Sequence, residues 1–347
     1  MGDRGLGMGE RQNSLSGLAA MWEGAGSSMN IFTADLALAI SRLTLLIALG
    51  WFLAQRGWVG PQARQPLMRL VIWVFFPAMI FDRVCGNRLI NSGGTTLLYL
   101  GVGFGMIVGG ILVGRLASAL LRFPEGNARR TFSYSAGINN FGYLGIPVTA
   151  ALFDRDVVGV LMVHNVGVEA AVWTFGVAFL SGGSGLKGLK NLAQPIPLAL
   201  VAALCVNFAG LGETAPAKFA AQFCHAVGEC AIPVGTILTG IFLHEVLKGY
   251  RFFAEPRVSL GIILVRGVVI PVLLLAIAAC FIPDPALRKV MMVQAAMPAG
   301  IFSFLIVEMY QGDVQVALRC SVLTMVLCPV VTPLWLYLGS RWLALAA

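Results

Sequence analysis

The sequence has very little charge. Asp, Glu, Lys and Arg together make up 12% of its 347 residues, against about 25% in an ordinary soluble domain. Hydrophobic residues make up 58%. This composition excludes an ordinary soluble protein and indicates an all-α polytopic membrane protein in which connectors are short and no separate soluble domain remains.

Catalytic motifs are also missing. The sequence contains no HExxH, no GxSxG and no GxxxxGK[ST], so it does not indicate a zinc hydrolase, a serine hydrolase or a nucleotide-binding enzyme. Its seven cysteines form no CxxC pair, and a thiol inside an apolar segment packs as a small apolar group. We therefore predict that the protein is not an enzyme and has neither a cofactor nor a metal.

One glycine-rich segment, GVGFGMIVGGILVG at 101–114, superficially resembles a nucleotide loop. No strand precedes it, so it predicts close helix packing instead. The net charge of +8 comes from Lys and Arg scattered between apolar segments. That distribution is typical of membrane orientation signals and does not indicate nucleic-acid binding.

Ten apolar segments follow one another along the chain, and about 20 apolar residues are enough to cross a bilayer. The predicted spans are 31–55, 67–85, 95–121, 131–153, 157–180, 195–211, 219–247, 258–282, 289–310 and 314–343. An even number of spans places both termini on the same side of the membrane. Connectors after odd-numbered spans hold thirteen Lys and Arg and the opposite side holds nine, which predicts both termini outside the plasma (inner) membrane.

An internal repeat appears when the sequence is shifted by 159 residues. Residues 123–130 then fall on 282–289, matching proline, acid and both basic positions, and Asp154 falls on Asp313. Five spans separate the copies, so they have opposite topology, as in many secondary transporters. We predict a disordered tail at 1–28 with Met29 as an alternative start, repeats at 29–182 and 195–347, and a cytoplasmic connector at 183–194.

Spans four and nine are predicted to be broken helices. Span four contains Asn139 and Asn140 between glycines, which disfavour a continuous helix. Pro298 occupies the position equivalent to Asn139 in span nine and removes a helical hydrogen bond. Freed backbone groups at membrane depth are tolerated where they are buried in protein or line a cavity, so the breaks indicate a site. The alternative is an ordinary kink at Pro298 and asparagines that join helices.

Motifs in four spans make the sequence similar to a known family. They are NNFGYLGIP at 139–147, AMPAGIFSF at 296–304, VFFPAMIFDR at 74–83 and CAIPVGTILTG at 230–240. Together they resemble the auxin efflux carrier family, including its bacterial members, over nearly the whole chain from Met29. The resemblance implies two inverted five-helix repeats in which helices four and nine cross at their breaks, as in bile-acid-symporter-like carriers.

Transport of organic anions is what this resemblance implies: indole acetate in plants, and malonate, malate or similar carboxylates in bacteria. The family's crossover asparagine falls on Asn140, followed by Pro147, and its second crossover proline on Pro298. Many relatives carry proline where this chain has Asn139. The resemblance also implies an elevator mechanism, in which the broken helices move against a scaffold built mainly from spans one, two, six and seven.

A carboxylate at the membrane midplane needs hydrogen-bond donors. Each half-helix that starts at a break presents free N–H groups and a partial positive charge, and the asparagines add NH₂ donors. The predicted substrate-binding residues are Asn139, Asn140, Gly142, Gln294, Pro298, Ala299, Gly300 and Ser303, and the predicted hinges are Gly137, Gly142, Pro147 and Pro298.

Few charges lie inside the predicted spans. Arg42, Glu169 and Arg266 are predicted to serve in ion coupling or in structural ion pairs, since an unpaired charge at mid-bilayer is costly. For Glu169 the two readings are an arginine partner and a proton or ion site; either arginine is also a candidate to meet the substrate. His225 and Glu229, four residues apart, are read as polar residues at the outer membrane edge in preference to a metal pair.

These observations predict a secondary transporter of small organic anions in the lipid bilayer, working by alternating access. Coupling to H⁺ or Na⁺ and assembly as a homodimer stay open. The alternatives are a sodium-coupled bile-acid-type symporter and a membrane receptor or sensor that binds its ligand without moving it.

Overall fold

The computed structural model describes residues 38, 41, 42, 44–87, 89, 90, 92–123, 125–182, 195–248, 255–301 and 303–343. The predicted tail at 1–28 and the predicted connector at 183–194 lie outside these residues. Every regular element within them is a helix, which confirms the all-α class.

The first half of the described chain contains a helix at Thr44–Gln55, α2 (Pro61–Leu70), η1 (Val71–Phe75), α3 (Phe76–Val84), α4 (Gly93–Leu120), α5 (Asn127–Gly137), α6 (Gly145–Leu152), α7 (Arg155–Ala171), η2 (Val172–Gly176) and α8 (Val177–Leu180). The second half contains α9 (Pro195–Phe208), η4 (Leu211–Glu213), α10 (Ala215–Gly228), α11 (Ala231–Leu247), α12 (Pro256–Leu264), η5 (Val265–Val269), α13 (Ile270–Phe281), α14 (Pro285–Ala296), α15 (Ser303–Met309) and α16 (Val314–Trp342). Among these, η1, η2 and η5 are π-helical turns inside longer helices.

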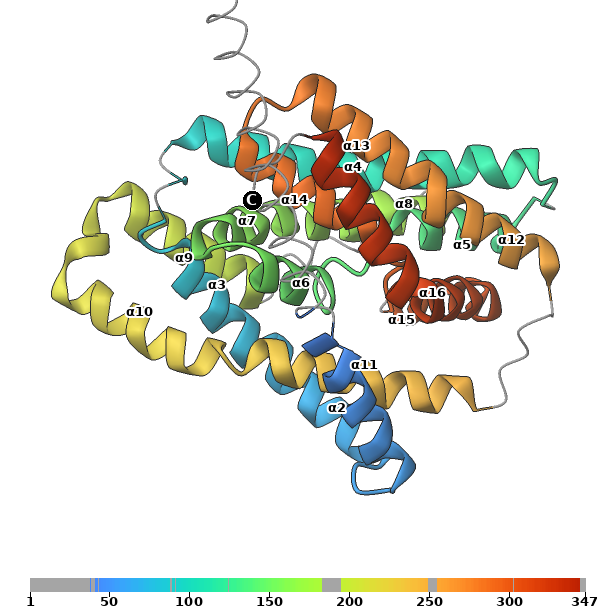
Figure 1. Cartoon of the computed structure of the whole chain (residues 1–347), viewed down its shortest axis with the longest axis horizontal. Coiled ribbons are helices and arrows are strands. Elements are labelled where there is room, and N and C mark those ends of the chain that lie inside the picture. Colours follow the sequence, from blue (N-terminus) through green and yellow to red (C-terminus); the bar gives the residue numbers. More distant parts are fainter. Residues whose placement is uncertain are drawn as a thin grey trace, which may run out of the picture.

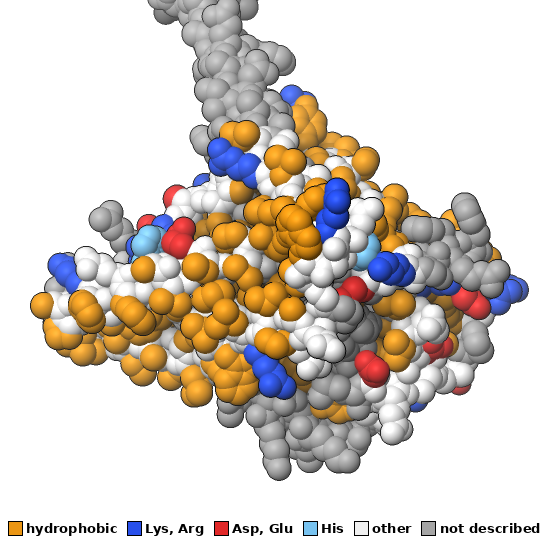
Figure 2. Space-filling model, turned by 90° about the horizontal axis from the view of Figure 1, so that it is seen from below, with side chains coloured by type: hydrophobic (Ala, Val, Ile, Leu, Met, Phe, Trp, Pro, Cys, Tyr) orange, Lys and Arg blue, Asp and Glu red, His pale blue; other side chains and the backbone are white. Residues whose placement is uncertain are grey.

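Five of the described helical runs are long and apolar enough to cross a membrane. They are Gly93–Leu120, Arg155–Leu180, Ala215–Glu245, Pro256–Phe281 and Val314–Trp342. In Figure 1, α10 and α11 follow one another across the lower part of the molecule and α2 extends below them, α4 lies across the upper part, and the short helix α6 lies between α4 and α11. Figure 2 shows apolar side chains over most of the visible described surface, as lipid-facing helices require.

Aspartates fix where three of the helices begin. Asp154 accepts a hydrogen bond from the Val157 N–H (3.0 Å) at the start of α7, and Asp313 accepts one from the Val316 N–H (3.1 Å) at the start of α16. Asp284 does the same for α14. Such caps satisfy amides that have no partner within the helix. Asp154 and Asp313, which the 159-residue shift aligns, therefore have the same local role.

The glycine-rich segment of α4 packs as predicted, on one face. A Cβ at Gly103 would lie 2.1 Å from the His164 carbonyl oxygen of α7, and one at Gly110 would lie 2.8 Å from the Gly137 carbonyl oxygen of α5. Gly105 has no neighbouring atom within 4 Å of such a Cβ. Glycine thus lets the backbones of α4, α5 and α7 approach closely, and Gly114 does the same against Ser133 of α5, whereas Gly101 and Gly109, like Gly105, have no neighbour within 4 Å of such a Cβ.

We expect Gly103→Ala to destabilise the protein by about 1–3 kcal/mol, because the added methyl group forces α4 away from α7. Gly105→Ala is the matched control on the same helix and should leave stability unchanged or slightly higher. Thermal unfolding of the two purified variants measures the difference. Equal melting temperatures would show that α4 and α7 do not need this close contact.

Candidate functional site

Two non-helical segments, 138–144 between α5 and α6 and 297–301 between α14 and α15, lie against each other. The Asn140 N–H donates to the Pro298 carbonyl (2.8 Å) and the Gly300 N–H donates to the Ile138 carbonyl (2.9 Å). Asn139 and Ala299 thereby form an isolated antiparallel bridge. Backbone groups released by one break are satisfied by the other, which is what an interrupted helix inside a membrane requires.

The predicted hinge residues have different positions relative to these breaks. Gly137 is the last residue of α5, and a Cβ there would lie 2.4 Å from the Ile111 backbone nitrogen, so it serves close packing against α4. Gly142 lies within the first non-helical segment and Pro298 within the second. Pro147 lies inside α6, beyond the break.

The interface between the breaks also explains a glycine in the second one. A Cβ at Gly300 would lie 2.9 Å from the Asn139 carbonyl oxygen and 3.3 Å from the Ile138 side chain. Any larger residue would separate the paired segments. Gly300 is thus needed for the backbone contact itself.

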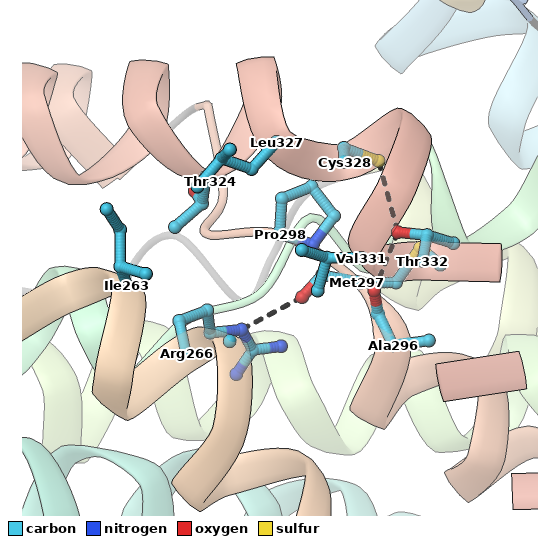
Figure 3. A pocket seen from close by; sticks show the side chains of 11 residues that line it. Ile263, Arg266, Ala296, Met297, Pro298, Thr324, Leu327, Cys328, Val331 and Thr332 are labelled. Carbon is cyan, nitrogen blue, oxygen red and sulfur yellow. Dashed lines mark hydrogen bonds between the residues drawn. The ribbon is translucent and has the colours of Figure 1, made fainter. Parts of the chain in front are cut away.

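Arg266 anchors the end of α14. Its Nε donates to the Met297 carbonyl (2.9 Å) and its Nη2 donates to the Gln294 carbonyl (3.2 Å), as Figure 3 shows for Met297. The side chain is buried. Its charge faces the C-terminal, negative end of α14, where a cation is favoured. Its observed partners are the backbone carbonyls at that end.

A small pocket beside Arg266 contains Pro298. Its wall comes from α12, η5, the end of α14, the second break and α16, and its members are Ile263, Arg266, Gly267, Ala296, Met297, Pro298, Thr324, Leu327, Cys328, Val331 and Thr332. Thr332 Oγ1 donates to the Ala296 carbonyl (2.8 Å) and the Ala299 N–H donates to Thr324 Oγ1 (3.0 Å). Side chains of α16 thus complete the hydrogen bonds of the second break.

A chain of amides links the breaks to α7. Asn139 Nδ2 donates to the Gln294 carbonyl (3.1 Å) and to Gln294 Oε1. Gln294 Nε2 donates to Asn165 Oδ1 (3.0 Å), and Asn165 Nδ2 donates to the Phe141 carbonyl (3.3 Å). The Asn139 and Gln294 donors are therefore used within the protein, which makes these two residues supports of the break.

A cavity of about 300 Å³ lies on the other side of the paired breaks. Its wall comes from α2, η1, α3, the breaks, α6, α7, η2 and α15. The lining residues are Met68, Ile72, Phe76, Ile80, Ile138, Asn139, Asn140, Phe141, Gly142, Tyr143, Ile146, Met162, Asn165, Val166, Glu169, Val172, Trp173, Gly300, Ile301, Ser303 and Ile306. Five predicted binding residues line it (Asn139, Asn140, Gly142, Gly300, Ser303). Gln294, Pro298 and Ala299 do not.

Asn140 presents an unused donor in this cavity. The residue is 3% exposed, and its Nδ2 has no hydrogen-bond partner among the described residues. A buried amide without a partner costs about 1–3 kcal/mol. A ligand that accepts a hydrogen bond there would recover that loss.

The half-helices that follow the breaks offer fewer free amides than expected. The Gly145 N–H donates to the Asn140 carbonyl (3.0 Å), and the Ile146 N–H donates to the Gly142 carbonyl (3.3 Å). The Ser303 N–H donates to the Gly300 carbonyl (3.2 Å), and Ser303 Oγ donates to the same oxygen (2.7 Å). These three amides are therefore already hydrogen-bonded within the protein. The Asn140 side chain is consequently the more important donor for binding an anion.

Glu169 is the charged residue among the lining residues of the cavity. It lies one helical turn beyond Asn165, on the same face of α7. No ion pair joins it to an arginine within the described part of the chain. Arg266 binds the carbonyls of α14, and Arg42 is exposed and does not line the cavity.

Several lining residues were not predicted from the sequence. Phe76, Tyr143 and Trp173 give the cavity aromatic walls, but single aromatic residues in apolar spans do not stand out from lipid-facing ones. Asn165 had a stronger signal, because an amide in an apolar helix usually faces a partner. Only its position beside Gln294 shows what that partner is.

Comparison with known proteins adds independent information. A family model described as "Membrane transport protein" matches residues 36–191 and again residues 185–336. A protein of Methanothermobacter thermautotrophicus named "Uncharacterized transporter" is 25% identical over 297 residues, which cover 84% of this chain and 94% of that protein.

Proposed function

The chain belongs to the membrane transport protein family, which includes the auxin efflux carriers that its motifs resemble, and we propose that it carries small organic anions such as mono- or dicarboxylates. The protein is thus a multi-pass membrane transporter by family, and the cargo is the proposed part. The plasma (inner) membrane is its proposed location.

The observation that carries the proposal is the unpartnered Asn140 Nδ2 in the cavity at the paired breaks. A carboxylate oxygen is the matching acceptor, and hydrogen bonds to charged groups are stronger than those between neutral groups. The aromatic and aliphatic walls would take the carbon skeleton of the cargo. A neutral donor also binds an anion without the cost of a permanently buried cation.

We further propose that the helices form ten spans in two inverted repeats, 29–182 and 195–347, joined by a cytoplasmic connector at 183–194, with both termini outside. Supporting features are the two family matches along the chain, the paired breaks and the equivalent caps Asp154 and Asp313. Alternating access would then move the breaks against α2 and α3 in an elevator motion. A homodimer would give the scaffold a fixed partner.

Glu169 favours H⁺ over Na⁺ as the coupling ion in this proposal. A carboxylate cargo would share the cavity with the Glu169 carboxyl group, and two like charges in one low-dielectric site repel strongly. A proton on Glu169 removes that repulsion. Proton and anion would therefore bind together.

Glu169→Gln is expected to preserve anion binding and to abolish the response of transport to an imposed proton gradient, because the amide mimics the protonated acid. Uptake into proteoliposomes with and without a pH gradient measures this. Glu308→Gln, at an exposed position of α15, is the control. A variant that still responds fully to the gradient would exclude Glu169 as the proton site, and Na⁺-dependent uptake would favour the bile-acid-type alternative.

Counterflow tests the transport function itself. Proteoliposomes loaded with an unlabelled carboxylate should accumulate the labelled compound, and candidates come from a thermal-shift screen, since a ligand that binds only the folded state raises the melting temperature. Ligands that stabilise the protein without any exchange would instead support a receptor or sensor. If the protein exchanged none of the mono- or dicarboxylates that it binds, the proposed function would be contradicted.

A further inference from the structure

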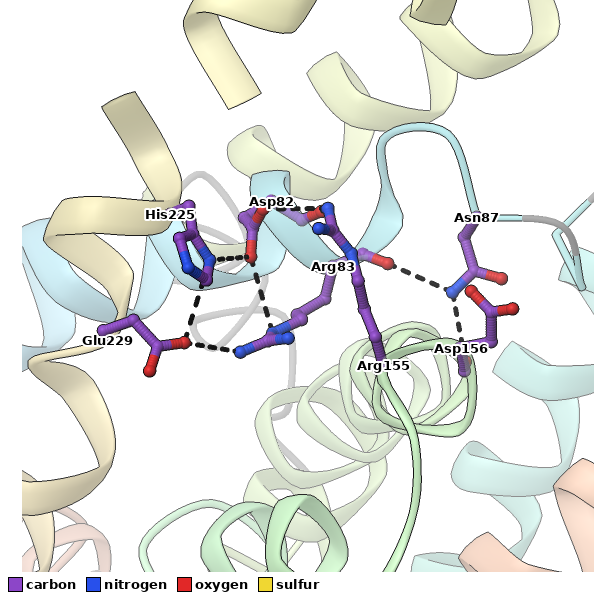
Figure 4. Close-up of polar contacts among 7 residues, drawn as sticks. All are labelled: Asp82, Arg83, Asn87, Arg155, Asp156, His225 and Glu229. Atoms are coloured by element: carbon purple, nitrogen blue, oxygen red, sulfur yellow. Dashed lines mark hydrogen bonds and ion pairs between the residues drawn. The ribbon is translucent and has the colours of Figure 1, made fainter. Parts of the chain in front are cut away.

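A cluster of charged side chains lies at the far end of the helices that line the cavity. Asp82, in the last turn of α3, has a side chain only 3% exposed. Its carboxylate accepts from Arg155 Nη2 of α7 (2.8 Å) and lies 3.1 Å from His225 Nδ1 of α10. Arg155 also donates to the Asp82 carbonyl. Figure 4 shows the three elements converging on Asp82.

Close packing accompanies these ion pairs. Asn87 Nδ2 donates to the Asp156 carbonyl (3.0 Å) and to the Arg83 carbonyl (3.1 Å). A Cβ at Gly159 would lie 2.0 Å from Asn87 Nδ2. The end of α3 and the start of α7 are thus in direct contact here, with no space between them for a cargo.

The same two elements separate on the cavity side. Met68, Ile72, Phe76 and Ile80 line the cavity at intervals of four residues along α2, η1 and α3, and Glu169 and Trp173 line it from α7 and η2. The boundary between α3 and α7 is therefore open along the cavity and closed at Asp82. A second cavity, of about 300 Å³, borders the cluster directly and is lined by Asp82, Cys85, Arg155, Gly212, Lys218, Ala221, Gln222 and His225.

We propose that the Asp82–Arg155 ion pair is a gate that closes the cargo cavity at the face where α3 ends, and that it must open for the cargo to pass between the two cavities. The inference rests on the proposed carrier function, since alternating access needs one face closed while the other is open. Asp82 and Arg155 are positioning residues of the transport cycle. Separation of α3 from α7 would take the Arg155 cation (2.8 Å) away from the buried carboxylate and leave it with Arg83 Nε (3.5 Å) and His225 Nδ1 (3.1 Å), so the contact with Arg155 favours the closed state.

His225 and Glu229 belong to the same cluster in different ways. His225 contacts Asp82 directly, whereas Glu229 accepts from Arg83 Nη2 (2.6 Å) and lies 3.8 Å from His225 Nδ1. Glu229 therefore stands outside the α3–α7 ion pair and provides a matched control. The two residues predicted to lie at the outer membrane edge are thus neighbours of the gate.

Labelling of a cysteine at position 80 tests the gate. Ile80→Cys places a thiol in the cavity wall, and a membrane-impermeant thiol reagent is added to sealed vesicles from the face at which α3 ends. Peptide mass spectrometry reads the label at residue 80, so the native cysteines remain in place. Asp82→Asn should raise the labelling rate from this face by about tenfold, within the usual range of conformational coupling.

Arg155→Gln should have the same effect, Arg155→Lys should keep most of the protection, and Glu229→Gln should leave labelling unchanged. Arg155 is a half-exposed side chain, so its variants decide the question even if Asp82→Asn fails to fold. Unchanged labelling in Arg155→Gln would overturn the gate and leave the cluster as a structural contact. The measurement needs no cargo, so increased labelling without any transport would keep the gate and reject the proposed function.

Discussion

Asn140→Ala is expected to lower anion binding and transport by roughly ten- to a hundredfold, the value of a hydrogen bond to a charged group at about 1.5–3 kcal/mol. The backbone of Asn140, and not its side chain, is what the fold uses: its N–H joins the two breaks by donating to the Pro298 carbonyl, and its carbonyl accepts from the Gly145 N–H at the start of α6. Alanine keeps both backbone bonds. The variant should therefore insert and fold normally while losing its cargo.

Binding by thermal shift and counterflow by proteoliposome exchange measure the two parts of this expectation. Asn127→Ala is the control. Asn127 is the first residue of α5, the helix that precedes the first break, and it donates to the Gln311 carbonyl (2.8 Å) at an exposed site. Asn139→Ala should differ from the Asn140 and Asn127 variants by lowering the stability of the protein, because it removes the hydrogen bonds from Asn139 to Gln294. Wild-type exchange by Asn140→Ala would exclude Asn140 as the cargo contact.

Arg266→Met is expected to lower both stability and transport. The change leaves the Met297 carbonyl without the donor that it has in the native protein and takes one donor from the Gln294 carbonyl. An unsatisfied buried group costs about 1–3 kcal/mol. Methionine has a similar length, so the loss comes from the missing donors and charge at the end of α14 and not from an empty space.

Thermal unfolding should show a melting temperature several degrees below that of the native protein, with transport reduced in the molecules that remain folded. Arg257→Met, at an exposed position near the start of α12, should change neither. Arg266→Lys should recover part of the stability, since an ammonium group keeps the charge but not the fork of two donors. Native stability in Arg266→Met would mean that other groups satisfy these carbonyls.

The role of Arg266 illustrates a general limit of sequence reasoning. A lone arginine in an apolar helix predicts a partner, but the charge alone does not distinguish a substrate carboxylate from backbone carbonyls. The distinction depends on which groups η5 brings next to α14. The same holds for Glu169, whose readings as an ion-pair residue and as a cavity residue become distinguishable only when the surrounding helices are in place.

The sequence by itself determined the class of the protein and the positions of two interruptions in its helices. Low charge and long apolar segments indicated a helical membrane protein, and the paired asparagines and Pro298 marked two interruptions, because these residues disrupt a helix locally. Such local effects depend only on a residue and its neighbours in the chain. Such interruptions can therefore be predicted without a structure.

The tertiary structure decided which polar groups are used and which are left for a ligand. It paired Asn139 with Gln294, anchored α14 on Arg266 and left Asn140 Nδ2 without a partner in the cavity. It also brought Asp82 and Arg155 together across 73 positions of sequence. Hydrogen bonding between distant segments depends on how helices pack, and helix packing is set by the whole chain.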